Sequence, residues 1–296
     1  MKLSLFVTVL AALAVAGGVT GTADAADHRL RAPFEVLRGD DMGMIEFVSL
    51  TLRNRCAEEA GFPQFTQTMP YTRPVDPFTF RHVTAATFGR TSEEEAHRLG
   101  FGFDAPAQPP PLWTRNAAFL AVAERCDAEA WERIGPGARA AYDAYFELAN
   151  RLMPYRAEVD ARIPVPLRAA VLDCLNRYGY DVPDRDAYLA NPRVDAFGVP
   201  FGHHEPRPGE DWQPDVDRPD DIQIGPALGP ARYVPTLGEQ RFAVAFFRCG
   251  ESTGRVRITM RIAVEVQREY VHRFRAELAA QNPVIRRLAR SAAALL

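Results

Sequence analysis

The sequence predicts a mainly α-helical protein that is held by two disulfide bonds and interrupted by long proline-rich irregular segments. Three observations indicate this fold. Apolar residues recur every three or four positions in several long segments, which is typical of amphipathic helices. The chain contains four cysteines, an even number, and 24 prolines among its 296 residues. No segment shows a sustained alternation of apolar and polar residues, so an all-β fold is disfavoured.

The composition excludes several broad classes of protein. Hydrophobic residues make up 47% of the chain and charged residues 25%, as in ordinary globular proteins, so general disorder is excluded. The net charge of −3 gives no overall basic character, and we expect no nucleic-acid partner. Only Lys2 is lysine and the other 34 basic residues are arginine, which indicates the codon usage of a GC-rich genome.

Residues 1–25 have the pattern of a secretory signal peptide. Lys2 is followed by an apolar stretch over residues 3–19, and Ala23-Asp24-Ala25 matches a small-residue cleavage site. An uncleaved anchor is the alternative, although a spanning helix needs about 20 apolar residues. No cysteine follows for lipid attachment, and no other segment is apolar enough to span a bilayer. We expect a secreted or extracytoplasmic protein with no membrane span after cleavage.

The four cysteines of an exported chain are expected to form disulfide bonds. Three pairings are possible. Cys56 and Cys126 lie 70 residues apart, and Cys174 and Cys249 lie 75 apart. These similar separations favour Cys56–Cys126 and Cys174–Cys249. The chain has no C-x-x-C spacing, which disfavours a zinc site or a thioredoxin-like redox pair.

The similar separations also indicate a weak internal duplication, with one half at residues 26–150 and the other at 151–296. In each half, a cysteine at a helix end is followed after four residues by glycine and an aromatic residue. In each half, a phenylalanine also precedes the second cysteine by seven positions. The alternative is two unrelated helix pairs that each needed a disulfide. The matching residues are Gly61-Phe62 and Gly179-Tyr180, Phe88-Gly89 and Phe197-Gly198, and Phe119 and Phe242.

The order of these motifs resembles a broad group of uncharacterised four-cysteine exported proteins and lipoproteins of actinobacteria. The resemblance extends to the C-terminal part, through Ala243-Val244-Ala245, Cys249, Thr253-Gly254 and Gln267. In that group methionine often follows the first cysteine of each half, whereas this chain has Ala57 and Leu175, and it lacks the lipobox of many members. The resemblance implies export and a helical, disulfide-bonded fold, but no activity and no catalytic residues.

Helix patterns, caps and breakers divide the chain into segments. Residues 181–238 contain ten prolines without a helical or strand period, and we expect a long irregular loop there. Residues 239–249 are ambiguous, and we predict a helix by analogy with 115–126. We expect the long C-terminal helix to break at Asn282-Pro283. The helices expected are 42–60, 92–99 with a capping box from Ser92 to Glu95, 115–133, 136–152, 166–178, 239–249 and a C-terminal helix from about 256.

Candidate chemistry comes from three motifs. Gly250–Gly254 has the G-x-S-x-G form of a hydrolase nucleophile turn at Ser252, but the chain leaves too few residues after it for the rest of that fold. His203-His204-Glu205 contains metal-ligand types, although adjacent side chains rarely converge on one ion. An acidic cluster offers the oxygen ligands that calcium prefers, without the EF-hand glycine and glutamate. The residues of this cluster are Asp215, Asp217, Asp220 and Asp221.

The sequence therefore favours an exported, non-catalytic protein with a binding or structural role at or outside the cell envelope, and with an unknown protein or envelope partner. Two alternatives stay open. An envelope hydrolase requires a carboxylate beside His203 or His204, and a calcium-dependent interaction module requires the acidic cluster to converge. A binding module predicts an exposed groove of aromatic residues, drawn from Tyr71, Phe101, Phe103, Trp113, Trp131 and Trp212. We expect no cofactor other than possible calcium.

Overall fold

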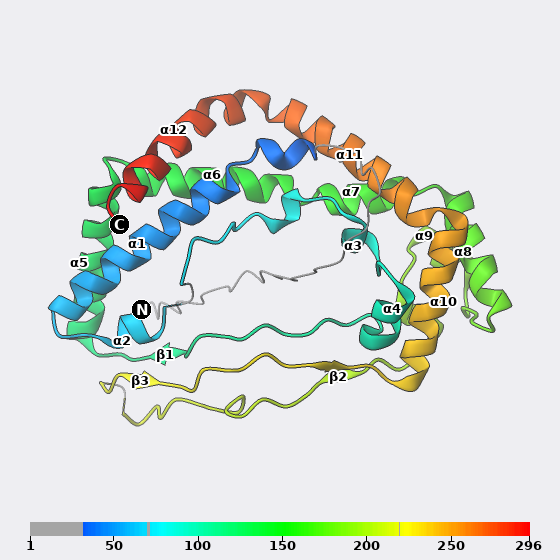
Figure 1. Ribbon diagram of the computed structural model, residues 1–296, viewed down its shortest axis with the longest axis horizontal. Helices are drawn as coiled ribbons and strands as arrows, with labels where there is room; N and C mark the ends of the chain where they lie inside the picture. The colour runs from blue at the N-terminus through cyan, green and yellow to red at the C-terminus, as the bar shows by residue number, and fades with distance from the viewer. Residues whose placement is uncertain (1–31, 70–71, 219) are drawn as a thin grey trace, which may run out of the picture.

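The computed structural model describes residues 32–69, 72–218 and 220–296, and the predicted signal peptide lies outside them. The described chain is mainly helical, as predicted. Its helices form an arch, with α11 and α12 along the top, α1 and α5 at one end, and α8 and α10 at the other (Figure 1). Long extended segments close the base of the arch. Within the described ranges, no helix is both long and apolar enough to cross a bilayer.

The helical segments agree with the sequence prediction at most positions. The 239–249 segment is helical, and it belongs to a longer helix. The bounds are η1 (Pro33–Val36), α1 (Gly39–Glu59), α2 (Gln64–Gln67), η2 (Thr79–Arg81), α3 (Ala85–Phe88), α4 (Glu93–Leu99), α5 (Ala117–Ile134), α6 (Ala138–Leu152), α7 (Tyr155–Arg162), α8 (Val165–Arg177), α9 (Arg185–Ala190), η3 (Val194–Phe197), α10 (Leu237–Thr253), α11 (Arg255–Arg273) and α12 (Arg275–Ala293).

The proline-rich segments form the base, through short antiparallel pairings. Strand β1 (Leu112–Trp113) pairs with β3 (Gln223–Ile224), and β2 (His203–His204) pairs with β4 (Tyr233–Val234). Isolated bridges join Ala105 to Ala231 and Gln108 to Leu228. The predicted loop 181–238 also contains α9 and η3. Proline removes backbone donors, so only such short pairings form, and the chain stays extended between them.

The main hydrophobic core lies under the arch and contains residues from both sequence halves. Met42, Ile45 and Val48 of α1 pack with Tyr145 and Leu148 of α6. Helix α12 packs on α1 and α6, and α4 packs on α10. The two predicted halves, 26–150 and 151–296, are therefore not packed separately.

Both disulfides form with the predicted pairing, and their surroundings match in detail. Cys56–Cys126 joins α1 to α5, and Cys174–Cys249 joins α8 to α10. Glycine ends the first helix of each pair in a left-handed conformation, at φ +90° for Gly61 and +85° for Gly179. The next amide then donates to a carbonyl five residues back, from Phe62 to Ala57 at 2.8 Å and from Tyr180 to Leu175 at 3.1 Å. Both ends are thus Schellman caps.

The aromatic residue after each cap packs on the equivalent partner helix. The rings of Phe62 and Phe119 lie 5.4 Å apart, and those of Tyr180 and Phe242 lie 4.7 Å apart. This agreement between the two ends is the structural counterpart of the repeated sequence pattern. Each disulfide closes a unit made of two helices, a Schellman cap and an aromatic pair.

The proposed match between Phe88-Gly89 and Phe197-Gly198 is wrong in structural terms. Phe88 packs against the central core, whereas Phe197 lies 4.8 Å from Phe242 in the second disulfide cluster. Gly198 is left-handed, but Gly89 is extended. In the first cluster, the second ring on Phe119 is instead that of Phe65, stacked at 4.4 Å.

The predicted helix break at Asn282-Pro283 is also wrong, because Pro283 lies inside α12 and the break falls at Phe274. Proline removes the hydrogen bond to the carbonyl of Ala279, but both residues lie on the exposed face, where water replaces the donor. Asn282 holds this turn in place. Its amide donates to the carbonyl of Val36 at 3.1 Å and its oxygen accepts from Tyr145 at 2.7 Å.

A buried carboxylate fixes where the base meets the arch. Glu239, in the first turn of α10, is fully buried. It accepts from the amides of Phe101 at 2.8 Å and Gly202 at 2.6 Å, and from the hydroxyl of Tyr233 at 3.0 Å. Burial and the bond to Glu239 raise the pKa of Tyr233, so its hydroxyl remains a donor. A Cβ on Gly202 would overlap the carbonyl of Val234, so the close approach requires glycine there.

We expect Glu239→Gln to lower the free energy of unfolding by about 2–3 kcal/mol, because the amide NH2 would replace one carboxylate oxygen and place a donor against one of the two backbone amides. Urea unfolding followed by circular dichroism measures this change. Glu251→Gln is the matched control, since Glu251 is exposed on the same helix. Equal midpoints for the two variants would contradict the anchoring role of Glu239.

Candidate functional site

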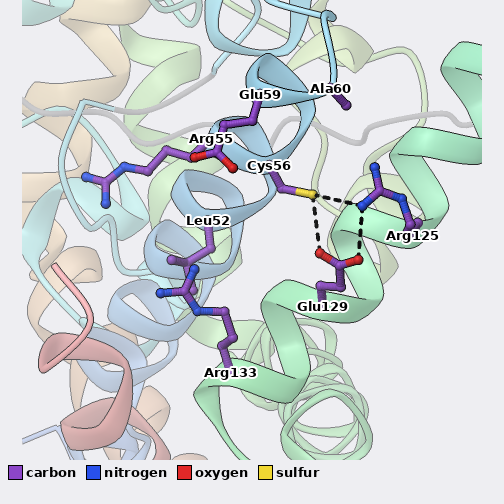
Figure 2. A pocket seen from close by; sticks show the side chains of 8 residues that line it. All are labelled: Leu52, Arg55, Cys56, Glu59, Ala60, Arg125, Glu129 and Arg133. Atoms are coloured by element: carbon purple, nitrogen blue, oxygen red, sulfur yellow. Dashed lines mark hydrogen bonds and ion pairs between the residues drawn. The ribbon is translucent and has the colours of Figure 1, made fainter.

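The described chain has a groove of about 450 Å³ at the seam between α1 and α5, beside the first disulfide (Figure 2). Helix α1 supplies Arg55 and Glu59, four residues apart and therefore on one face. Helix α5 supplies Arg125, Glu129 and Arg133, which are also spaced four residues apart and lie on one face. The lining residues are Leu52, Arg55, Cys56, Glu59, Ala60, Arg125, Glu129 and Arg133.

The charges of the groove are only partly compensated. Nη1 of Arg125 lies 3.1 Å from Oε1 of Glu129, and this ion pair lies against the disulfide. Figure 2 shows the pair at the sulfur of Cys56, with Arg55 and Arg133 extending away from it. Arg55 and Arg133 have no ion-pair partner among the described residues. The groove therefore offers two available guanidinium groups, which suit a carboxylate or phosphate.

The sulfur of Cys56 is reachable from the groove. It lies 3.5 Å from Oε2 of Glu129 and 3.9 Å from Nη1 of Arg125. Cys56 is partly exposed, whereas Cys126, Cys174 and Cys249 are buried. The second disulfide lies among Phe242 and other apolar residues of its cluster. The two disulfides thus differ in accessibility, despite their similar local structure.

The predicted calcium ligands do not converge. Arg218 lies between them, with its guanidinium 3.5 Å from Asp215 and 3.9 Å from Asp221. Asp217 donates its amide to Asp215, and Gln223 bonds the backbone of the same turn. Among the described residues, no three His, Cys, Asp or Glu side chains are placed to hold a metal ion. The acidic cluster forms an arginine-paired turn at the end of the base.

The candidate catalytic motifs also stay apart. Nε2 of His204 lies 2.8 Å from the carbonyl of Phe103, and within the described chain neither His203 nor His204 forms an ion pair with a carboxylate. Ser252 donates to the carbonyl of Cys249 at 3.2 Å, in the last turn of α10. His272 lies about 25 Å further along α11. The G-x-S-x-G string is a helix-to-helix turn around Gly254.

The aromatic residues do not form one groove. Trp131 is buried on Tyr142, at 5.2 Å between rings, and Phe101 packs against Phe242 at 5.2 Å. Trp212 lies against Gly225 in the base. Tyr71 lies outside the described residues. The described aromatic residues therefore lie in separate parts of the fold and not in the shared groove expected of a binding module. The groove described above is lined mainly by charged residues.

Sequence reasoning did not select the groove residues. The spacing of four between Arg125, Glu129 and Arg133 places them on one helix face, but such spacing is common on exposed helices. The useful signal is the predicted Cys56–Cys126 bond. It places Arg55 and Arg125, the neighbours of the two cysteines, on facing helices.

Comparisons with protein families, curated proteins and solved structures find no match to this chain.

We expect a mild phosphine reductant to open Cys56–Cys126 in the native protein before Cys174–Cys249, because the reductant must reach a sulfur atom. The difference in rate should be about tenfold or more, which corresponds to about 1.4 kcal/mol in activation free energy. Alkylation at intervals, followed by peptide mass spectrometry, measures the two rates. Simultaneous loss of both bonds would show that reduction requires unfolding, and would contradict the accessible position of Cys56.

Proposed function

We propose that this protein is an exported, non-catalytic binding protein of the cell envelope, and that the groove between α1 and α5 receives an anionic group of its ligand. The observation that carries the proposal is the pair of unpartnered arginines, Arg55 and Arg133, in a groove of ligand-binding size. Two intramolecular disulfides and the signal-like N-terminus support export.

The groove favours a ligand that carries a carboxylate or phosphate beside a polar neutral part. Arg55 and Arg133 attract the anionic group, and the unpaired Glu59 accepts a hydrogen bond from a donor beside it. The floor at Leu52 and Ala60 contributes little apolar area. Recognition is therefore mainly electrostatic, and binding should weaken as salt increases.

A binding role agrees better with the described site than either alternative. A hydrolase needs a nucleophile and a base within hydrogen-bond reach, and Ser252 and His272 do not meet. A calcium module needs several oxygen ligands around one ion, and Arg218 lies among the acidic residues instead.

A fluorescent tripeptide with a single glutamate and an amidated C-terminus is a suitable probe, because it carries only the one carboxylate that the groove is proposed to receive. We expect Arg55→Gln/Arg133→Gln to weaken its binding by about tenfold, through the loss of two charge-assisted contacts. Fluorescence anisotropy at low salt measures the affinity. Arg177→Gln/Arg241→Gln is the control for total charge, because these two arginines are exposed on α8 and α10, away from the groove.

A second variant separates the groove from general electrostatic attraction. Ala60→Trp fills the groove without changing any charge, and Ala60 is exposed, so folding should be preserved. We expect it to weaken binding as strongly as the arginine variant. Unchanged peptide binding by Ala60→Trp would overturn the assignment of the site.

Export is tested on the protein recovered from outside its producing cells. We expect its intact mass to begin near Ala26 and to show no added label after alkylation without reductant. Two or four labels on the folded protein would contradict the disulfide-bonded state, and a mass that includes residues 1–25 would favour an uncleaved anchor.

A further inference from the structure

The two helices along the top of the arch are strongly basic. Residues 255–293, which form α11 and α12, contain nine arginines and three glutamates, a net charge of +6. The whole chain has a net charge of −3, so the remaining residues carry −9. The overall net charge of −3 therefore does not reveal that positive charge is concentrated in α11 and α12.

Most of these arginines lie on one outer stripe, here called the arginine ridge. Its positions repeat every three or four residues from Arg257 to Arg275 and resume at Arg286, eleven residues later. They face away from Ala263, Tyr270 and Ile285, which are buried. All of the ridge residues are exposed. The ridge consists of Arg257, Arg261, Arg268, His272, Arg275, Arg286 and Arg290, with Glu265 between them.

The ridge arginines have no ion-pair partner in the described chain, because other elements occupy the nearby acids. Glu269 pairs with Arg162 of α7 at 2.6 Å, and Glu277 pairs with Arg151 of α6. Glu265 is the remaining acid of these helices, and it forms no ion pair among the described residues. The ridge thus presents uncompensated positive charge over about 50 Å of helix.

The shape and composition of the ridge decide between kinds of partner. A membrane-surface helix inserts large apolar side chains. The exposed large hydrophobic residues of the described chain include none within 255–293. The two helices also bend at Phe274, and their outer side is convex (Figure 1). A flat bilayer would touch only the apex, whereas a flexible linear polymer can follow the whole ridge.

We infer that the arginine ridge binds a linear anionic polymer, with the polymer lying along α11 and α12 and its phosphate or carboxylate groups contacting successive arginines. Arginine suits both groups because its guanidinium forms paired hydrogen bonds with either. No residue of α11 or α12 lines the groove between α1 and α5, so the ridge is a second, separate surface.

The test compares variants of equal net charge in binding to long-chain polyphosphate and to polyglucuronate, measured by calorimetry at low salt. Arg261→Glu/Arg268→Glu/Arg286→Glu changes the ridge. Arg73→Glu/Arg177→Glu/Arg241→Glu is the control, because these exposed arginines form no ion pair in the described chain and lie on other elements. We expect the ridge variant to lose at least about tenfold in affinity and the control about twofold or less.

Each outcome decides one point. Binding of both polymers indicates a general polyanion surface, and preference for one identifies the anionic group that the ridge recognises. Equal losses in the ridge and control variants would show that only net charge matters and would overturn the inference. Binding to vesicles of anionic lipid but to neither polymer would also overturn it. If the ridge variant melts early, the corresponding Arg→Gln set repeats the comparison.

The ridge and the groove are tested independently. Arg55→Gln/Arg133→Gln should keep its polymer affinity, and the ridge variant should keep its affinity for the single-glutamate peptide, which has only one carboxylate and cannot contact successive ridge arginines. Loss of polymer binding in the groove variant would place the polymer on α1 and α5 instead, and would overturn the ridge assignment while leaving the groove proposal intact.

Discussion

A buried carboxylate must be surrounded by donors, and Glu239 obtains them from three separate segments. The amides of Phe101 and Gly202 and the hydroxyl of Tyr233 all reach it. The base of the arch must therefore converge on the first turn of α10. Arg90 holds the same segment from the other side, through the carbonyl of Gly100 at 2.8 Å. The desolvation cost of one acid is thus offset by contacts that fix the long extended chain.

Each end of the arch contains the same local unit, two disulfide-linked helices with a Schellman cap and an aromatic pair. Different elements pack on the two units. At the second disulfide, α4 packs on α10, and Phe101 and Phe197 lie against Phe242. At the first, Phe65 of α2 stacks on Phe119 of α5, and α1 and α5 carry arginine and glutamate along the groove beside Cys56. The second end holds the base to the arch. The first end instead has a groove beside the partly exposed Cys56.

Interactions between neighbours in the chain explain which features were predictable. The cysteine–glycine–aromatic pattern encodes a Schellman cap within six residues, so the helix ends follow from sequence. The disulfide pairing was favoured by the similar separations of the cysteines, and it is the pairing that forms. Glu239 gives no such signal, because its donors are mostly backbone amides that any sequence supplies. Pro283 misled the prediction because its cost depends on whether the carbonyl of Ala279 faces water. Predicting the groove required knowing that α1 and α5 face each other, and the residue spacing along either helix alone does not show this.

The separation of charge between the ridge and the rest of the molecule has a directional consequence. Because residues 255–293 carry a net charge of +6 and the rest of the chain a net charge of −9, the asymmetry would orient the protein as it approaches an anionic polymer. Helices α11 and α12, which carry the ridge, run along the top of the arch, and the extended base lies opposite (Figure 1). A protein held by its ridge therefore directs the base outward. No residue of α11 or α12 lines the groove at the end of the arch, so the proposed polymer and the proposed groove ligand would not compete for the same side chains.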